Sequence, residues 1–186
     1  MSKEFFSILI IFLFGVVKSS TDHDAKDILS YMDKYLDTHA SKSYYMTIDP
    51  DGLLDEIDHK MLAKYQNIIF DNYGIITLII VARGLKGGER DLNNFKKNFY
   101  KEFEKTVKMK DLRCVVSIIT VNNMKLIVDS TSKIKYIFND RVLSALTDKM
   151  KVTFYQNHLF LSIYELLKNV EKAQKQFSAK GAVTDL

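Results

Sequence analysis

The chain has 186 residues, of which 47% are hydrophobic and 27% are charged, and its formal net charge is +4. This length fits one domain, and the composition is that of a globular protein, which excludes a largely disordered chain. The basic residues are spread along the sequence, with no dense run beyond Lys96 and Lys97. The charge pattern therefore favours a soluble surface over a nucleic-acid-binding one.

The first segment of the chain has the pattern of a secretory signal. Residues 5–17 are almost all apolar and follow Lys3. This run is shorter than the roughly 20 residues that a membrane-spanning helix needs, and it matches the apolar core of a signal peptide. We therefore expect residues 1–19 to be a signal peptide cleaved after Ser19, and the mature protein to be secreted and extracellular. An uncleaved anchor is the alternative, and no other apolar run predicts a membrane span.

A helix and a short strand are predicted next. Apolar residues recur at helical spacing in residues 20–42, which we assign as an N-terminal helical segment that Thr21 and Asp22 can cap. Residues 44–48 are β-prone and could form an edge strand. Residues 49–52 read Asp-Pro-Asp-Gly, which is a strong β-turn signature.

A second helix is predicted to start near Asp55 and to close at Gly74, which suits a left-handed cap. Its polar outer face includes Glu56 and Lys60. Its inner stripe is predicted to comprise Leu54, Ile57, Met61, Tyr65 and Ile68.

The central strand is predicted at residues 75–81, which are nearly all apolar and mostly β-branched. Such a run, without alternation and bounded by Gly74 and Gly84, is typical of a strand buried on both faces. We expect residues 84–88 to form a flexible loop into a third helix at about residues 89–107. One face of that helix carries Leu92, Phe95, Phe99, Phe103 and Val107.

A hairpin and two helices complete the predicted domain. Two apolar runs at residues 112–121 and 124–129 are separated by Asn122 and Asn123, which predicts a β-hairpin with a two-residue turn. The last two helices should begin near Asn139 and Asn157. Their inward residues are predicted to be Leu143, Leu146, Met150, Phe160, Ile163, Leu167 and Val170.

These elements predict an α/β fold in three layers, with a small mixed sheet between helices. The central strand, the third helix and the next strand should form a right-handed parallel crossover, followed by the antiparallel hairpin. We assign residues 43–178 to this domain and residues 179–186 to a flexible tail. The loop after the central strand and the hairpin turn then meet at one end of the sheet, the usual ligand site of open α/β sheets. The binding rim predicted there comprises Arg83, Lys86, Asn122 and Asn123.

Few residues predict cofactor chemistry. The acidic group at Asp49, Asp51, Asp55 and Asp58 is explained by a turn and a helix cap, with a loosely held calcium ion as the alternative. No two histidines have metal-ligand spacing, so zinc catalysis has no support. Cys114 is the only cysteine, so no intramolecular disulfide can form, and its place in a strand predicts a buried, inert thiol.

The order of these pieces resembles the TPM domain family. The resemblance covers about residues 44–170, and it is best at the Asp-Gly-Leu-Leu of residues 51–54, at the strands of residues 75–82 and 115–120, and at the hairpin. The family groups thylakoid-lumen proteins of photosystem II repair, bacterial secreted proteins, and nematode modulators of the levamisole-sensitive acetylcholine receptor. It implies a small mixed sheet with helices on both faces, and some plant members are described as acid phosphatases.

The chain departs from the family where hydrolysis would be supported. Lys110-Asp111-Leu112 replaces the usual Asn-Gly, residues 122–125 replace the Asp-Arg pair of the hairpin, and residues 130–132 lack a glycine. We therefore expect a non-enzymatic domain that binds or modulates a membrane protein complex such as a ligand-gated acetylcholine receptor. The alternative is a weak metal-assisted acid phosphatase that uses Asp51 or Asp111.

Overall fold

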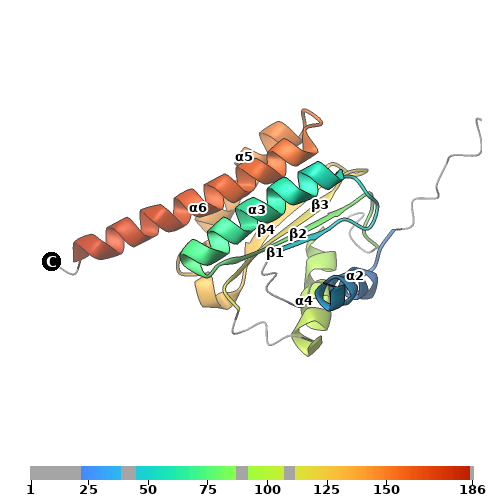
Figure 1. Ribbon diagram of the computed structural model, residues 1–186, viewed down its shortest axis with the longest axis horizontal. Coiled ribbons are helices and arrows are strands. Elements are labelled where there is room, and N and C mark those ends of the chain that lie inside the picture. The colour runs from blue at the N-terminus through green and yellow to red at the C-terminus, as the bar shows by residue number, and fades with distance from the viewer. Residues whose placement is uncertain (1–21, 39–44, 87–91, 107–111, 185–186) are drawn as a thin grey trace, which may run out of the picture.

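The computed structural model describes residues 22–38, 45–86, 92–106 and 112–184, which form a layered α/β domain with one long helix extending from it (Figure 1). The predicted signal peptide and Asp111 lie outside the described residues. The elements, in chain order, are α2 (Ala25–Thr38), β1 (Tyr45–Ile48), α3 (Glu56–Tyr73), β2 (Ile76–Ala82), α4 (Leu92–Thr106), β3 (Cys114–Thr120), β4 (Lys125–Ser130), the short 3-10 helix η2 (Ser132–Ile134), α5 (Asp140–Phe154) and α6 (Leu159–Thr184).

The four strands form one mixed sheet in the order β1-β2-β3-β4. Strands β1, β2 and β3 are parallel, with Ile48 opposite Ile80 and Ile80 opposite Ile118. Strand β4 is antiparallel to β3 and pairs Ile127 with Ile118. The predicted edge strand, parallel pair and hairpin are confirmed.

Two cores lie on opposite faces of the sheet, because successive side chains of a strand point to opposite sides. On one side, Ile79 and Val81 of β2 pack in a core with α3, α5 and α6. On the other, Leu78 and Ile80 pack in a second core with α2 and α4. These four side chains are at most 1% exposed, so the prediction of a strand buried on both faces is confirmed. Figure 1 shows the three layers.

The two crossovers of the sheet have opposite hands. Both connections advance in the same direction, from β1 to β2 and from β2 to β3. Their helices nevertheless lie on different faces, since α3 belongs to one core and α4 to the other. One of the two connections therefore departs from the right-handed rule. The right hand that we expect for the β2-α4-β3 connection stays a prediction.

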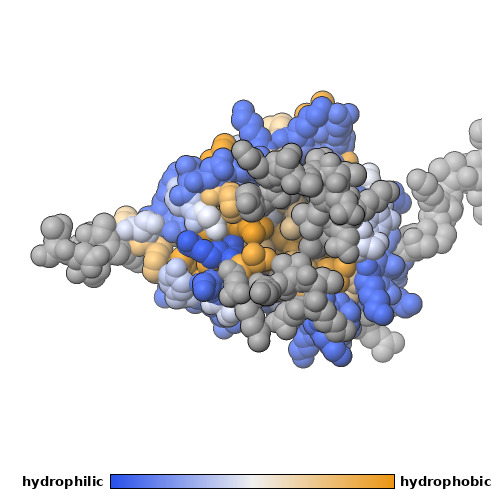
Figure 2. Space-filling model, turned by 60° about the horizontal axis from the view of Figure 1, so that its bottom comes forward, coloured by the Kyte–Doolittle hydropathy of each residue, from blue (hydrophilic) through white to orange (hydrophobic). Residues whose placement is uncertain are grey.

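The face of α2 and α4 has fewer helices than the face of α3, α5 and α6. Its core is dominated by the phenylalanine stripe of α4, which the sequence predicted at Phe95, Phe99 and Phe103. Partly buried Met46 and Ile127 pack beside this core. Figure 2 shows apolar residues near the centre of this face.

The predicted inner stripe of α3 is wrong at three of its five positions, whereas Leu54 and Tyr65 pack in or against the core as expected. Ile57, Met61 and Ile68 are 67%, 47% and 37% exposed, whereas Leu62 and Ile69 are fully buried. The buried stripe instead comprises Leu62, Gln66 and Ile69. The polar Gln66 interrupts this stripe in the sequence. Gln66 is buried because its side chain bridges helix and sheet, donating to the carbonyl oxygen of Thr77 (2.8 Å) and accepting from the Thr47 hydroxyl (3.2 Å).

Two helix ends differ from the predictions. Asp24, and not Asp22, caps α2: its Oδ1 accepts from the backbone nitrogens of Lys26 (2.8 Å) and Asp27 (3.0 Å), and Thr21 lies outside the described residues. At the other end of the chain α6 continues to Thr184, where we expected a flexible tail from residue 179.

The hairpin loop also differs, because Thr120 pairs with Lys125 and the loop therefore has four residues rather than two. Its last residue, Met124, has φ of +48°.

Candidate functional site

Three loops meet at the carboxyl edge of the parallel strands, where the sequence analysis placed the binding rim. They are the turn after β1, the segment after β2 and the hairpin loop after β3. The backbone nitrogen of Asn122 donates to the carbonyl oxygen of Arg83 at 2.9 Å, and that of Val121 donates to Ala82 at 3.0 Å. Strands β2 and β3 thus stay paired beyond their ends, and Arg83 and Asn122 are neighbours as expected.

A fourth segment reaches this edge from the N-terminal side of α2. The backbone of His23 donates to the carbonyl oxygen of Gly84 (3.3 Å) and accepts from the nitrogen of Lys86 (2.9 Å), as in a short parallel bridge. A Cβ on Gly84 would lie 1.9 Å from the carboxylate of Asp22, so glycine permits this close approach. We predicted a flexible loop from residue 84. Its first three residues are instead paired, and Leu85 is fully buried.

Asp51 joins the turn after β1 to both of these segments. Its Oδ2 accepts from the backbone nitrogen of Arg83 at 2.7 Å, and its Oδ1 lies 3.3 Å from Nε2 of His23. The two side chains are only 12% and 10% exposed. Both carboxylate oxygens of this catalytic candidate are therefore engaged in holding the edge together.

Asp49 has an equally structural set of contacts. Its two oxygens accept from the backbone nitrogens of Leu53 (2.9 Å) and Leu54 (2.7 Å), and His59 lies 3.6 Å away. Burial acts to raise the pKa of this carboxyl, but the nearby His59 side chain and the hydrogen bonds from the two backbone nitrogens outweigh burial and lower its pKa. Asp49 thus folds the turn that presents Asp51.

The remaining acidic residues of this cluster cap α3. Asp55 accepts from the backbone nitrogen of Asp58 at 2.8 Å, and Asp58 accepts in return from that of Asp55. The interpretation of the acidic cluster as a turn plus a helix cap is confirmed. Within the described ranges, no three side chains of histidine, cysteine, aspartate or glutamate gather as a metal site. The calcium alternative stays a prediction.

The predicted rim is exposed at the same edge. The side chains of Arg83, Lys86, Asn122 and Asn123 all face solvent, and the backbone bonds above link the first three to one another or to His23. The place of His23 at this edge was not predicted, because Asp51, Gly84 and Lys86, its partners there, are all distant from it in the sequence. A usable signal was Gly84, since an isolated glycine just after a strand indicates close backbone approach.

Cys114 is buried and takes no part in this edge. Burial raises the pKa of its thiol to about 12, so it stays protonated at neutral pH. The prediction of an inert thiol agrees with this.

Comparison with known proteins shows the fold of the chain. No family model matches it, and neither does any curated protein. A solved N-terminal domain of a P. gingivalis protein is 12% identical with a TM-score of 0.65, covering 82% of this chain and 92% of that one. The N-terminal domain of a Corynebacterium glutamicum protein is 9% identical with a TM-score of 0.56, covering 71% and 80%. The BA42 protein of Bizionia argentinensis is 10% identical with a TM-score of 0.53, covering 69% and 86%.

These likenesses show that the chain shares an α/β fold with domains of bacterial proteins. At such low identity they carry no activity or partner to this chain. Among the helices that the structure describes, none is both long and apolar enough to cross a membrane.

Proposed function

We propose that this chain is a secreted, TPM-like, non-enzymatic domain that binds or modulates a membrane protein complex such as a ligand-gated acetylcholine receptor. The binding surface is the rim of Arg83, Lys86, Asn122 and Asn123. The family resemblance supports the receptor as partner, and the apolar segment at residues 5–17 supports secretion.

The observation that carries this proposal is that the acidic residues and the rim residues of the carboxyl edge face in opposite directions. The carboxylates of Asp49 and Asp51 point into the protein, where they accept hydrogen bonds from its own backbone and lie beside His59 and His23. The two cations and two amides of the rim instead face solvent. Exposed cations and amides are accessible to a partner at the surface, whereas Asp51 would have to give up two contacts to act on a substrate.

The alternative is a weak metal-assisted acid phosphatase. One observation favours it: Asp51 stands beside Arg83, a cation able to hold a phosphate, at the edge where ligands bind in open α/β sheets. This reaction would require Asp51 to exchange His23 for a metal ion or a water molecule.

The rim can be tested by electrophysiology on cells that express a levamisole-sensitive acetylcholine receptor. Purified mature chain, starting at Ser20, should change the amplitude or time course of currents evoked by acetylcholine. The quadruple variant Arg83→Ala, Lys86→Ala, Asn122→Ala, Asn123→Ala should lose most of this effect, because it removes the rim and leaves the backbone bonds of the edge in place.

The matched control is Lys101→Ala with Lys133→Ala, which removes two exposed cations away from the rim. It should keep the full effect on the current. If the quadruple variant and the control act alike, the rim is not the binding surface; if wild-type chain changes no current, the receptor is not the partner.

A further inference from the structure

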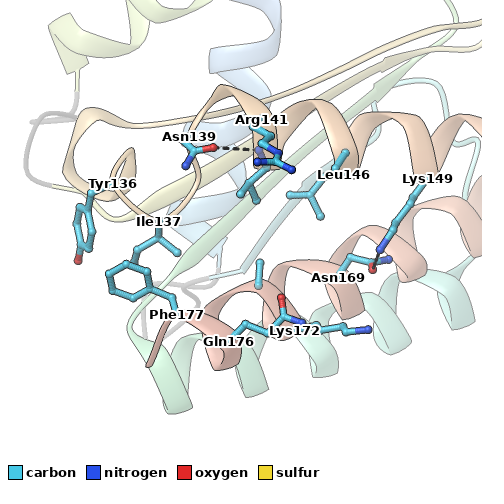
Figure 3. Close-up of a pocket in the computed structure, with 13 residues that line it drawn as sticks. Tyr136, Ile137, Asn139, Arg141, Leu146, Lys149, Asn169, Lys172, Gln176 and Phe177 are labelled. Atoms are coloured by element: carbon cyan, nitrogen blue, oxygen red, sulfur yellow. Dashed lines mark hydrogen bonds between the residues drawn. The ribbon is translucent and has the colours of Figure 1, made fainter. Parts of the chain in front are cut away.

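A groove of about 430 Å³ runs between α5 and α6, on the face opposite to α2 and α4 (Figure 3). Val142, Leu146 and Ala173 supply apolar surface to it, and Ile137 closes the end near η2. Its volume is in the range of ligand sites. The groove belongs to a different part of the domain from the rim, because α5 follows β4, which runs away from the rim edge.

The charged side chains that line this groove are all cationic. They are Arg141 and Lys149 from α5 and Lys172 from α6. Lys149 donates to the side-chain oxygen of Asn169 at 3.1 Å, which orients its ammonium group but leaves the charge unbalanced (Figure 3). Three positive charges along one groove, with no carboxylate in its lining, form an anion-attracting site.

The carboxylates of these two helices are engaged elsewhere. Asp140 pairs with Lys135 at 3.6 Å, and Asp148 pairs with Lys151 at 3.3 Å. On α6, Glu165 accepts from the Thr153 hydroxyl.

Glu171 likewise accepts from Lys175 and from the Tyr65 hydroxyl. The acidic residues of α5, and those of α6 as far as its side chains are described, thus have partners elsewhere, and none of them lines the groove.

One end of the groove carries two exposed aromatic rings. Tyr136 and Phe177 are 60% and 40% exposed, and their rings meet edge to face with centroids 5.4 Å apart. Gln176 and Asn139 also line the groove. The side-chain oxygen of Asn139 accepts from the backbone nitrogen of Val142 at 3.1 Å, and its amide nitrogen can donate to a ligand. Aromatic rings beside amides are typical of surfaces that bind polypeptide.

We propose that this groove binds a short, extended, acidic segment of a partner protein, with carboxylates on the three cations and apolar side chains on the floor. The groove residues of α5 extend from Arg141 to Lys149, which at about 1.5 Å per residue is about 12 Å. At about 3.3 Å per residue this length takes roughly four residues of extended chain. Charge complementarity selects the acidic segment, and the amides can pair with its backbone.

The test uses a fluorescein-labelled peptide of about six residues in which glutamate alternates with leucine, so that an extended chain points the two residue types to opposite sides. Fluorescence anisotropy should show binding to the wild-type protein with a Kd below about 1 mM. The triple variant Arg141→Gln, Lys149→Gln, Lys172→Gln should bind this peptide about tenfold or more weakly than the wild type does. A peptide with glutamine in place of glutamate should bind the wild type as weakly as the acidic peptide binds the variant. Raising the salt concentration to about 0.5 M should also weaken binding of the acidic peptide to the wild type.

The control variant Lys97→Gln, Lys101→Gln, Lys133→Gln removes the same charge from exposed positions outside the groove and should bind like the wild type. Phe177→Ala should weaken the binding of both peptides, because the aromatic end acts on apolar groups. Equal losses in the groove and control variants would overturn the proposal, as would the absence of binding by the wild type. Light scattering provides one further test. If the wild type forms a dimer and the groove variant does not, the groove binds a second copy of this chain, and the proposal is overturned.

Discussion

Phe99→Ala should lower the free energy of unfolding by about 3–5 kcal/mol, the largest stability effect that we expect from a single substitution. Phe99 is fully buried in the face of α2 and α4, between Phe95 and Phe103, whose ring centroids lie 6.3 and 5.4 Å from its own. Truncation leaves a cavity that the rigid sheet beneath cannot close. Urea denaturation followed by far-ultraviolet circular dichroism measures the change.

Two further variants make this prediction specific. Phe99→Leu keeps much of the volume and should cost about 1.5 kcal/mol or less. Tyr155→Ala truncates an aromatic residue that is 54% exposed and should change stability by about 0.5 kcal/mol or less. A cost of Phe99→Ala no larger than that of Tyr155→Ala would contradict the packing described for this face.

Asp49→Ala should lower the free energy of unfolding by about 3 kcal/mol at neutral pH, because it leaves the backbone nitrogens of Leu53 and Leu54 without their charged acceptor. The side chain of Asp49 is fully buried, so water cannot replace it at no cost. Asp71→Ala, which removes an exposed carboxylate from α3, is the matched control and should be nearly neutral.

The contribution of Asp49 should also depend on pH. Its pKa in the folded protein is lowered, so the stabilisation is complete above the unfolded value of about 3.9 and is lost as pH falls through the folded pKa. The stability difference between the wild type and Asp49→Ala should therefore narrow as the pH falls below about 4. A difference that widens on acidification would mean that the carboxyl is held in its neutral form.

Apolar patterns predicted the sheet and most of its packing. The unbroken run of β2, the phenylalanine spacing of α4 and the inward residues Leu143 and Met150 of α5 each identify an element and its buried face. Burial of apolar area dominates folding, and at these three elements the sequence pattern and the structure agree.

Two of the wrong or missing predictions occur where polar groups are buried. Gln66 occupies the inner face of α3 because its amide satisfies Thr47 and Thr77 of the sheet, and no helical pattern marks that role. The bond between His23 and Asp51 joins residues 28 positions apart, which local spacing cannot predict.

The sequence therefore predicted one part of the candidate site and not the other. Topology brought Arg83 and Asn122 to one edge, as expected. The inward engagement of Asp51, which supports the proposed binding function over the phosphatase alternative, needed the three-dimensional contacts.

The central claim is that Asp51 holds the edge together and takes no part in catalysis. The most direct measurement is hydrolysis of a generic phosphomonoester by the folded chain starting at Ser20, with and without magnesium or calcium, beside Asp51→Asn and the control Asp71→Asn. We predict no turnover above that of Asp51→Asn under any of these conditions, and a loss of stability in Asp51→Asn alone. Metal-dependent turnover that survives in Asp71→Asn and disappears in a folded Asp51→Asn would contradict the account and establish the phosphatase.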